Sequence, residues 1–218
     1  DESLARFSSF AIGGPADALV VVDERESLMP LLQCAEREGL NWRVIGKGSN
    51  LLIRDEGYRG LVIILGEDFS RIGPVTQGAA DQTINFTVGA GCSLTKLNHH
   101  CSREGYSGLT FSYGIPGSVG GAVVMNAGAW GKEISSVVTE VEVMSGQGSE
   151  TLSGDQLDFS YRCWPYFKNY KNSAIITGVN FRLGVQKSEL LTSEMKHLLQ
   201  KRKEVQPHNY PNGGSCFK

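Results

Sequence analysis

Residues 112–131 read SYGIPGSVGGAVVMNAGAWG, and this stretch decides what kind of fold the chain can have. Six of its twenty residues are glycine, too many for an ordinary helix, while the run AVVM is too apolar for a linker. Pro116 stiffens a turn, the neighbouring glycines permit positive φ and close approach, and Ser118 is a candidate helix cap. Two explanations stay open: a glycine-rich helix packed against another backbone, or a helix start that binds an anion.

A second glycine-rich stretch, GKGSN, occupies residues 46–50. A dinucleotide fingerprint needs GxGxxG at the start of a helix. Gly46 and Gly48 fit, but Leu51 stands in place of the third glycine, and residues 51–65 read as strand, turn and strand. The phosphate-loop pattern GxxxxGK[ST] is absent from the sequence. The stretch is therefore a turn between two strands, either a tight β-turn or a nest of backbone N–H groups for an anion.

Strand and helix patterns alternate around these two stretches. Apolar or alternating runs predict strands, and a serine before an amphipathic run predicts a helix start. The expected strands are 18–22 (a buried one), 42–46, 84–91, 137–144, one beginning at 150, and 174–183. The first expected helix is 28–39, capped by Ser27, with Pro30 in its first turn and Gly39 at its end. The second is 94–103, capped by Ser93 and ended by Gly105. A third is capped by Ser188 and stops near Pro207.

This order of elements predicts an α+β protein with two lobes. The first part is βαβ-like, the second is rich in strands, and the polar, glycine-rich residues 66–83 separate them. A third unit begins at the long C-terminal helix. Because the sequence ends on GGSCFK, inside an apparent loop, we expect a fragment of a longer protein.

Charge and composition exclude several classes of partner. The formal net charge is −2, which predicts no nucleic-acid partner. No apolar run approaches ~20 residues, so no membrane span is expected, and the first residues do not resemble a secretory signal, which favours a cytoplasmic location. An odd number of cysteines without a CxxC pair predicts buried free thiols and no metal site. These cysteines are Cys34, Cys92, Cys101, Cys163 and Cys216.

Five segments taken together point to one family. They are SSFAIGGPADALV (8–20), VIGKGSNLLI (44–53), GLTFSYGIPGSVGGAVVMNAGAWG (108–131), DFSYRCWPYFK (158–168) and QPHNYPNGGSCFK (206–218). In these segments, and over nearly its whole length, the sequence resembles the UDP-N-acetylenolpyruvoylglucosamine reductase family. The resemblance implies an FAD-binding fold of the vanillyl-alcohol-oxidase (PCMH) type, with FAD between two α+β subdomains. We expect these subdomains at 1–66 and 67–185, and the start of a substrate-binding domain at 186–218.

The resemblance also implies which residues bind FAD. The two glycine loops would hold its pyrophosphate and flavin, and the glycines would be required because the cofactor lies against the main chain. A late strand would run along the cofactor. The implied contacts are Gly46, Lys47, Gly48, Ser49, Asn50, Leu51, Tyr113, Gly114, Ile115, Pro116, Gly117, Ser118, Gly120, Gly121, Ala122 and Val179.

By resemblance, NADPH reduces FAD, and the enolpyruvyl ether of a UDP-sugar then receives a hydride and a proton. Arg162 matches the family's arginine, whose planar fork suits a carboxylate that gains charge, although a surface or ion-paired arginine is the ordinary alternative. Ser215 matches the proton donor, with a turn serine as the alternative and Cys216 as a chemical rival. Trp130 stands where the family often has tyrosine, and the family's catalytic glutamate would lie beyond Lys218.

Two other functions stay open beside that of a reductase in peptidoglycan precursor synthesis. One is an FAD-binding module without turnover, which the end of the sequence at Lys218 suggests. The other is a different oxidase with the same FAD fold. The expected partners are small molecules, NADPH and a UDP-sugar, and the sequence predicts no oligomeric state.

Overall fold

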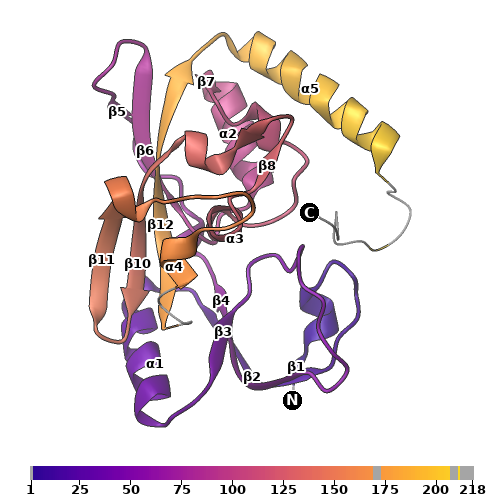
Figure 1. The fold of residues 1–218 in the computed structure, drawn as a ribbon, viewed down its shortest axis with the longest axis vertical. Coiled ribbons are helices and arrows are strands. Elements are labelled where there is room, and N and C mark those ends of the chain that lie inside the picture. Colours follow the sequence, from indigo (N-terminus) through magenta and orange to yellow (C-terminus); the bar gives the residue numbers. More distant parts are fainter. Residues whose placement is uncertain (1, 169–172, 207–210, 212–218) are drawn as a thin grey trace.

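The computed structural model describes residues 2–168, 173–206 and 211, and most of its strands lie in two sheets (Figure 1). The smaller sheet has the order β1-β2-β4-β3, with β2 and β3 both parallel to β4. Helix α1 (Arg25–Arg37) connects β2 to β3, so the predicted βαβ unit is present. The strands are β1 (Glu2–Ser3), β2 (Pro15–Val22), β3 (Trp42–Val44) and β4 (Tyr58–Leu65).

The larger sheet is antiparallel and has the order β11-β10-β12-β6-β5, with β7 also paired to β12. Strand β12, the last one among the described residues, therefore lies in the middle of the sheet. A separate hairpin joins β8 (Gly128–Ala129) to β9 (Lys132–Glu133). The strands of the larger sheet are β5 (Thr76–Gln77), β6 (Thr83–Gly89), β7 (Tyr106–Ser107), β10 (Val138–Ser145), β11 (Gly148–Ser153) and β12 (Ala174–Val185).

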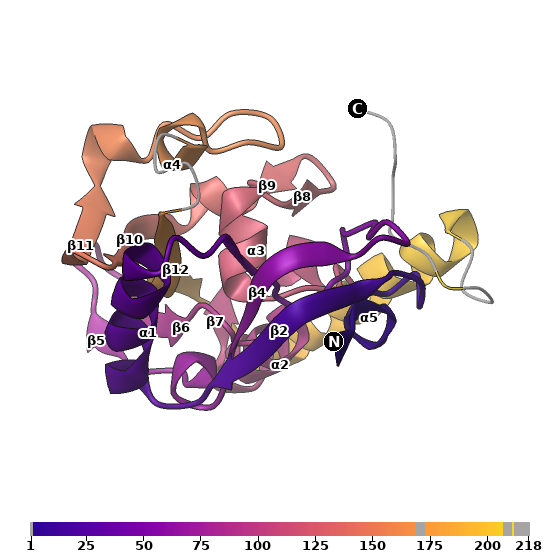
Figure 2. The ribbon, with the colours of Figure 1, turned by 90° about the horizontal axis from the view of Figure 1, so that it is seen from below.

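Helices α2 (Leu94–Glu104) and α3 (Val119–Val124) lie beside the larger sheet, and α5 (Ser188–Val205) packs on α2 (Figure 1). Seen from below, α1 and α5 lie at opposite ends of the molecule, with β2 and β4 between them (Figure 2). Leu28 and Leu32 of α1 share one core with Phe86 and Phe181 of the larger sheet. The remaining helices are short: α4 (Pro165–Lys168), η1 (Leu4–Phe7), η2 (Asp68–Ser70), η3 (Thr110–Ser112), η4 (Ile134–Ser136) and η5 (Gly154–Gln156).

The chain changes sheets between β4 and β5, within the stretch where the sequence suggests a boundary. However, α1 belongs to the smaller sheet's βαβ unit and also packs on β10 of the larger sheet. The division of the chain into two subdomains and the start of a third domain, at residues 66/67 and 185/186, remains a proposal.

Several element predictions are confirmed. The Ser93 hydroxyl accepts a hydrogen bond from the Lys96 backbone N–H at 3.1 Å and so caps α2. Gly105 ends this helix in the left-handed conformation at φ +78°, and Gly39 follows α1 at φ +63°.

Other element predictions are wrong. Ser27 lies inside α1 instead of capping it, Pro30 is in the second turn, and Ser188 is the first residue of α5, not its cap. Strand β2 is only partly buried, since Val21 is 48% exposed. No strand forms at the start of the 51–65 stretch. Pro207 lies outside the described residues.

The cysteine prediction is partly wrong. The four cysteines within the described residues are free thiols, as expected. Cys92 and Cys101 are buried, whereas Cys34 is exposed on α1 and Cys163 is partly exposed. Burial therefore distinguishes two inert thiols from an accessible one.

Candidate functional site

The two glycine-rich stretches meet in space. The Ser49 hydroxyl of GKGSN donates a hydrogen bond to the Pro116 carbonyl oxygen at 2.9 Å. A Cβ atom built on Gly117 would lie 3.3 Å from the Ser49 hydroxyl oxygen, and one built on Gly46 would overlap the Ser118 hydroxyl. The turn between β3 and β4 thus lies directly against the loop that precedes α3.

In the first loop, residues 46–53, two carbonyl groups are bonded to the segment that precedes β2. The Gly48 carbonyl accepts from the Ser9 N–H at 3.1 Å, and the Leu51 carbonyl accepts from the Ser8 hydroxyl at 3.0 Å. Within the described residues, none of the backbone N–H groups of 46–53 has a protein acceptor. A row of such donors is the usual lining of an anion site.

The second loop adds donors of the same kind. The backbone N–H groups of Gly114, Gly117 and Ser118 also lack an acceptor in the part of the chain that the structure describes. Gly114 and Gly117 have φ of +82° and +143°, conformations that favour glycine. The two loops together therefore offer backbone donors to a phosphate-bearing ligand such as FAD.

The backbone N–H groups in the first turn of α3 are bonded within the protein, which favours the packed helix over the anion site among the two explanations left open by the sequence. The Val119 N–H donates to the Cys92 carbonyl at 2.8 Å, and the Gly120 N–H donates to the Ala90 carbonyl at 2.8 Å. The Gly121 N–H donates to the Ser118 hydroxyl at 3.3 Å, which confirms Ser118 as the helix cap. All three donors of the first turn are thus used by the protein itself.

Two glycines assigned to the cofactor are needed by the protein's own backbone. Gly48 has φ +62°, and a Cβ atom there would overlap the Phe7 carbonyl oxygen. A Cβ atom on Gly120 would lie 2.9 Å from the Ala90 Cβ. Close packing of the chain on itself, the other explanation left open, accounts for both positions.

The first glycine loop also presents apolar side chains. Leu51 and Leu52 are 37% and 73% exposed, and Ile12, in the neighbouring segment, is 53% exposed. That segment is tied to the loop's end, because the Gly14 N–H donates to the Arg54 carbonyl at 2.9 Å. Backbone donors beside exposed apolar side chains suit the phosphates and the flat rings of FAD.

The other residues assigned to FAD divide into three groups. Lys47 and Asn50 are exposed on the first loop. The ring of Tyr113 packs edge-on against His99, with centroids 5.4 Å apart, and Ile115 is partly buried. Ala122 and Val179 lie in the core at 5% and 0% exposure, so the structure does not bring their side chains to a ligand-accessible surface.

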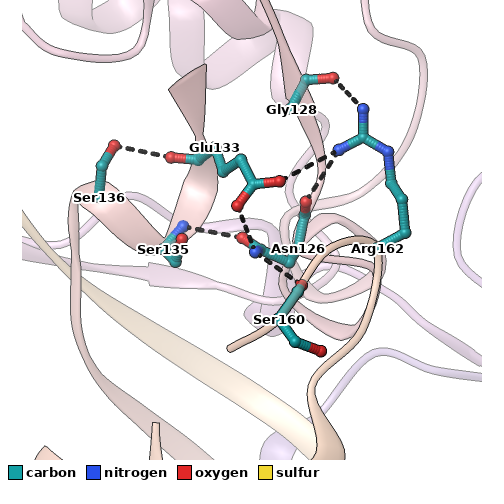
Figure 3. A network of polar contacts seen from close by, with 7 residues as sticks. All are labelled: Asn126, Gly128, Glu133, Ser135, Ser136, Ser160 and Arg162. Atoms are coloured by element: carbon teal, nitrogen blue, oxygen red, sulfur yellow. Dashed lines mark hydrogen bonds and ion pairs between the residues drawn. The ribbon is translucent and has the colours of Figure 1, made fainter. Parts of the chain in front are cut away.

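Arg162 lies in a separate polar network just after α3 (Figure 3). Its Nη2 donates to the Gly128 carbonyl at 2.8 Å, and its Nη1 donates to the Asn126 carbonyl at 3.2 Å. Glu133 Oε1 lies 3.8 Å from Nη1, while the Arg162 Nε–H has no acceptor among the described residues. Because α3 has six residues, about 9 Å of helix separates the second glycine loop from this network.

The polar network combines features of both explanations given for Arg162. The guanidinium group donates to two protein carbonyls and lies near a carboxylate, as a structural arginine would. Within the described residues its Nε–H is left for a ligand, and its backbone φ of +54° is unusual for a non-glycine residue, a feature that often marks functional sites. Trp130, at the position of the family's tyrosine, is 44% exposed and also has positive φ, +57°.

A further candidate site residue, which the sequence did not indicate, lies on α5. Arg202 of α5 is half-buried beside the second glycine loop, where a Cβ atom on Gly114 would lie 3.1 Å from the Arg202 Cδ. Burial lowers the pKa of its guanidinium group. The sequence offered only a basic residue in the last turns of a helix, a common position that does not by itself indicate a site.

The last predicted catalytic residue, Ser215, lies outside the described residues, as does Cys216. Within the described ranges, no group of three His, Cys, Asp or Glu side chains is arranged to hold a metal ion. None of the helices in that part of the chain has both the length and the apolar character needed to cross a membrane.

Residues 16–152 match the model of the FAD binding domain. UDP-N-acetylenolpyruvoylglucosamine reductase 2 of Symbiobacterium thermophilum is 43% identical over 218 residues, which span all of this chain and 68% of that protein. The Bacillus subtilis reductase is 37% identical, with 69% of its length covered.

Solved structures agree with the sequence comparisons. The reductase of Thermus caldophilus superposes with a TM-score of 0.79 at 32% identity, covering 99% of this chain and 73% of that one. A solvent-stable cholesterol oxidase superposes with a TM-score of 0.57 at 12% identity, covering 84% of this chain and 37% of that one, which shows a shared fold only. The fold is thus the PCMH-type FAD-binding fold, and the chain belongs to the UDP-N-acetylenolpyruvoylglucosamine reductase family.

Proposed function

We propose that the protein binds FAD across its two glycine loops and uses NADPH to reduce the enolpyruvyl ether of UDP-N-acetylglucosamine enolpyruvate to UDP-N-acetylmuramate. The observation that carries this proposal is the 43% identity to a reductase of that name over all 218 residues. The backbone N–H groups of residues 46–53, which have no acceptor among the described residues, support the cofactor part of it. Such a reaction on small soluble substrates would supply peptidoglycan precursors in the cytoplasm.

When bound, FAD supplies hydride transfer between NADPH and the substrate's double bond. The residues of this chain have different tasks. Loops 46–53 and 113–118 bind the cofactor through backbone N–H groups. The Nε edge of Arg162 binds the substrate carboxylate, on which negative charge develops as hydride reaches C3, and the Ser215 hydroxyl gives a proton to C2. Hydride and proton together convert the alkene into the lactyl ether, while NADPH becomes NADP⁺.

The first test is a visible absorption spectrum of the undenatured protein, produced from its complete gene. The flavin absorption bands should correspond to about one bound flavin per chain. The second is oxidation of NADPH, which should depend on the UDP-sugar. A folded protein that stays colourless with added FAD would contradict the cofactor assignment.

The two alternative functions give different results. Stable FAD binding with no NADPH oxidation, even with saturating UDP-sugar, would point to a flavin-binding module. Peroxide formation on an alcohol, without turnover of the UDP-sugar, would point to an oxidase. Either outcome would overturn the proposed reaction while leaving the family assignment intact.

A further inference from the structure

We propose that Asn126 is a positioning residue for Arg162: its side-chain amide orients the guanidinium group and keeps the Glu133 carboxylate from closing on it. This inference rests on the proposed function, since it assumes that Arg162 binds the substrate carboxylate. It assigns to Asn126 no contact with substrate or cofactor. Figure 3 shows the contacts that join Asn126, Glu133 and Arg162.

The Asn126 side chain is 1% exposed, and all its polar atoms are used. Its Nδ2 donates to Glu133 Oε2 at 2.8 Å and to the Ser160 carbonyl at 3.0 Å. Its Oδ1 accepts from the Ser135 N–H at 3.2 Å. A single amide therefore joins the end of α3, the β9–η4 segment and the turn that carries Arg162.

The Asn126 backbone contributes as well. Its carbonyl oxygen accepts from Arg162 Nη1 at 3.2 Å, and its φ is +38°. Asparagine tolerates positive φ better than most residues, whereas Arg162, at +54°, does not share that tolerance. The unusual backbone at Arg162 persists only if surrounding contacts fix it, and the bond from Asn126 to Ser160 is such a contact.

The Glu133 carboxylate is held away from Arg162 by Asn126. Its Oε2 is engaged by Asn126, and its Oε1 remains 3.8 Å from Arg162 Nη1, beyond hydrogen-bond distance. Carboxylate and guanidinium groups otherwise form close bidentate pairs. Without the Asn126 donor, the Glu133 carboxylate would be free to move onto Arg162 and compete with the substrate carboxylate.

The test is a double-mutant cycle with Asn126→Asp and Arg162→Ala, measured by stopped-flow on the flavin-loaded protein from its complete gene. Aspartate keeps the size of asparagine and its acceptor for Ser135, but it has no donor for Glu133 or Ser160. Asn126→Asp should slow flavin reoxidation by the UDP-sugar about 10- to 100-fold, the scale of a small misplacement at a reacting centre. Flavin reduction by NADPH should stay unchanged, and in the Arg162→Ala background the substitution should have no further effect.

Ser136→Ala is the matched control, because Ser136 lies in η4 beside Ser135, and its hydroxyl donates to the Glu133 carbonyl at 2.7 Å without reaching Arg162. It should change neither half-reaction. Equal slowing of both half-reactions by Asn126→Asp, or an undiminished effect in the Arg162→Ala background, would overturn the inference and make Asn126 merely structural. If Arg162→Ala alone leaves flavin reoxidation unchanged, that result contradicts the role of Arg162 in the proposed function, binding of the substrate carboxylate.

Glu133→Gln provides a second route, should Asn126→Asp fail to fold. Glutamine keeps an acceptor for Asn126 Nδ2 but removes the competing charge. Reoxidation at saturating UDP-sugar should stay within about fivefold of the wild-type rate, the size of a partly exposed ion pair. The half-saturating concentration of UDP-sugar should not rise. A loss of rate as large as that of Arg162→Ala would contradict the role given to the Asn126 amide.

Discussion

At the scale of single residues, Gly48 meets two constraints that other residues cannot meet together. It has φ +62°, and the Phe7 carbonyl occupies the space where a Cβ atom would be. Gly131, at φ +75°, has open space at the same position. We expect Gly131→Ala to cost about 1 kcal/mol of unfolding free energy from backbone strain alone. Gly48→Ala should cost about 1–3 kcal/mol more, because Phe7 must move.

Urea unfolding of both variants measures this difference. Equal losses of unfolding free energy would show that the Phe7 contact carries no cost. The clustering of glycines along the sequence indicated loops with a special task. It did not indicate that Gly48 faces Phe7 and Gly120 faces Ala90, because those neighbours are distant in the sequence and meet only in the folded chain.

Arg162 gives a prediction about chemistry rather than stability. Arg162→Ala should leave FAD bound and slow flavin reoxidation by the UDP-sugar about 100-fold or more, as expected when a group that stabilises developing charge is lost. Arg182→Ala is a suitable control, since Arg182 is exposed on β12 and donates to Asn85 Oδ1 at 3.3 Å. Loss of bound FAD in step with loss of rate would instead make Arg162 structural.

At the scale of elements, local signals located helices better than they located helix starts. Ser93 caps α2 as predicted because its partner, Lys96, is in the same helix. Ser27 does not cap α1, because the Arg25 N–H is satisfied at 3.1 Å by the Asp68 carboxylate, far along the chain. The helix therefore begins before Ser27. Such a tertiary cap leaves no local pattern to read.

Helix α5 depends on a narrow apolar stripe for its attachment. Leu191 is 1% exposed, while its neighbour Leu190 is 54% exposed. Leu191→Ala should therefore cost about 2–4 kcal/mol of unfolding free energy, whereas Leu190→Ala should cost less than about 0.5 kcal/mol. Hydrogen exchange of the α5 amides should accelerate only in the Leu191 variant. Similar behaviour of the two variants would mean that α5 is not held through this face.

At the scale of the whole molecule, the strands were predictable but their pairing was not. Alternating and apolar runs located β6, β10 and β12 along the chain. That β12 lies between β10 and β6 follows from contacts between distant residues, such as Val179 with Val141 and Val88. The contact between the two glycine loops likewise joins residues that are distant in the sequence. The family resemblance suggested it, while neither loop contains a signal that specifies contact with the other.

The global stability of the protein should fall at alkaline pH because of a buried thiol. Cys101 is 2% exposed in the main core, and burial, with Cys92 close by, raises the pKa of its thiol from 9.0 to about 12. Well below pH 9 the thiol is protonated in both the folded protein and the unfolded chain, so it does not change the unfolding free energy with pH. Between about pH 9 and 12 the unfolded chain releases this proton while the folded protein retains it, so ionisation favours unfolding.

Cys101→Ala should remove that part of the pH dependence. Urea unfolding at pH 8 and pH 10.5, with reductant present, measures it. The wild type should lose about 2 kcal/mol more than Cys101→Ala between the two pH values, because about 1.5 pH units lie above the ordinary thiol pKa. Cys34→Ala is the control, since it removes an exposed thiol and leaves Cys101 in the core. Parallel pH profiles for the wild type and Cys101→Ala would show that Cys101 ionises in the folded protein as readily as in the unfolded chain.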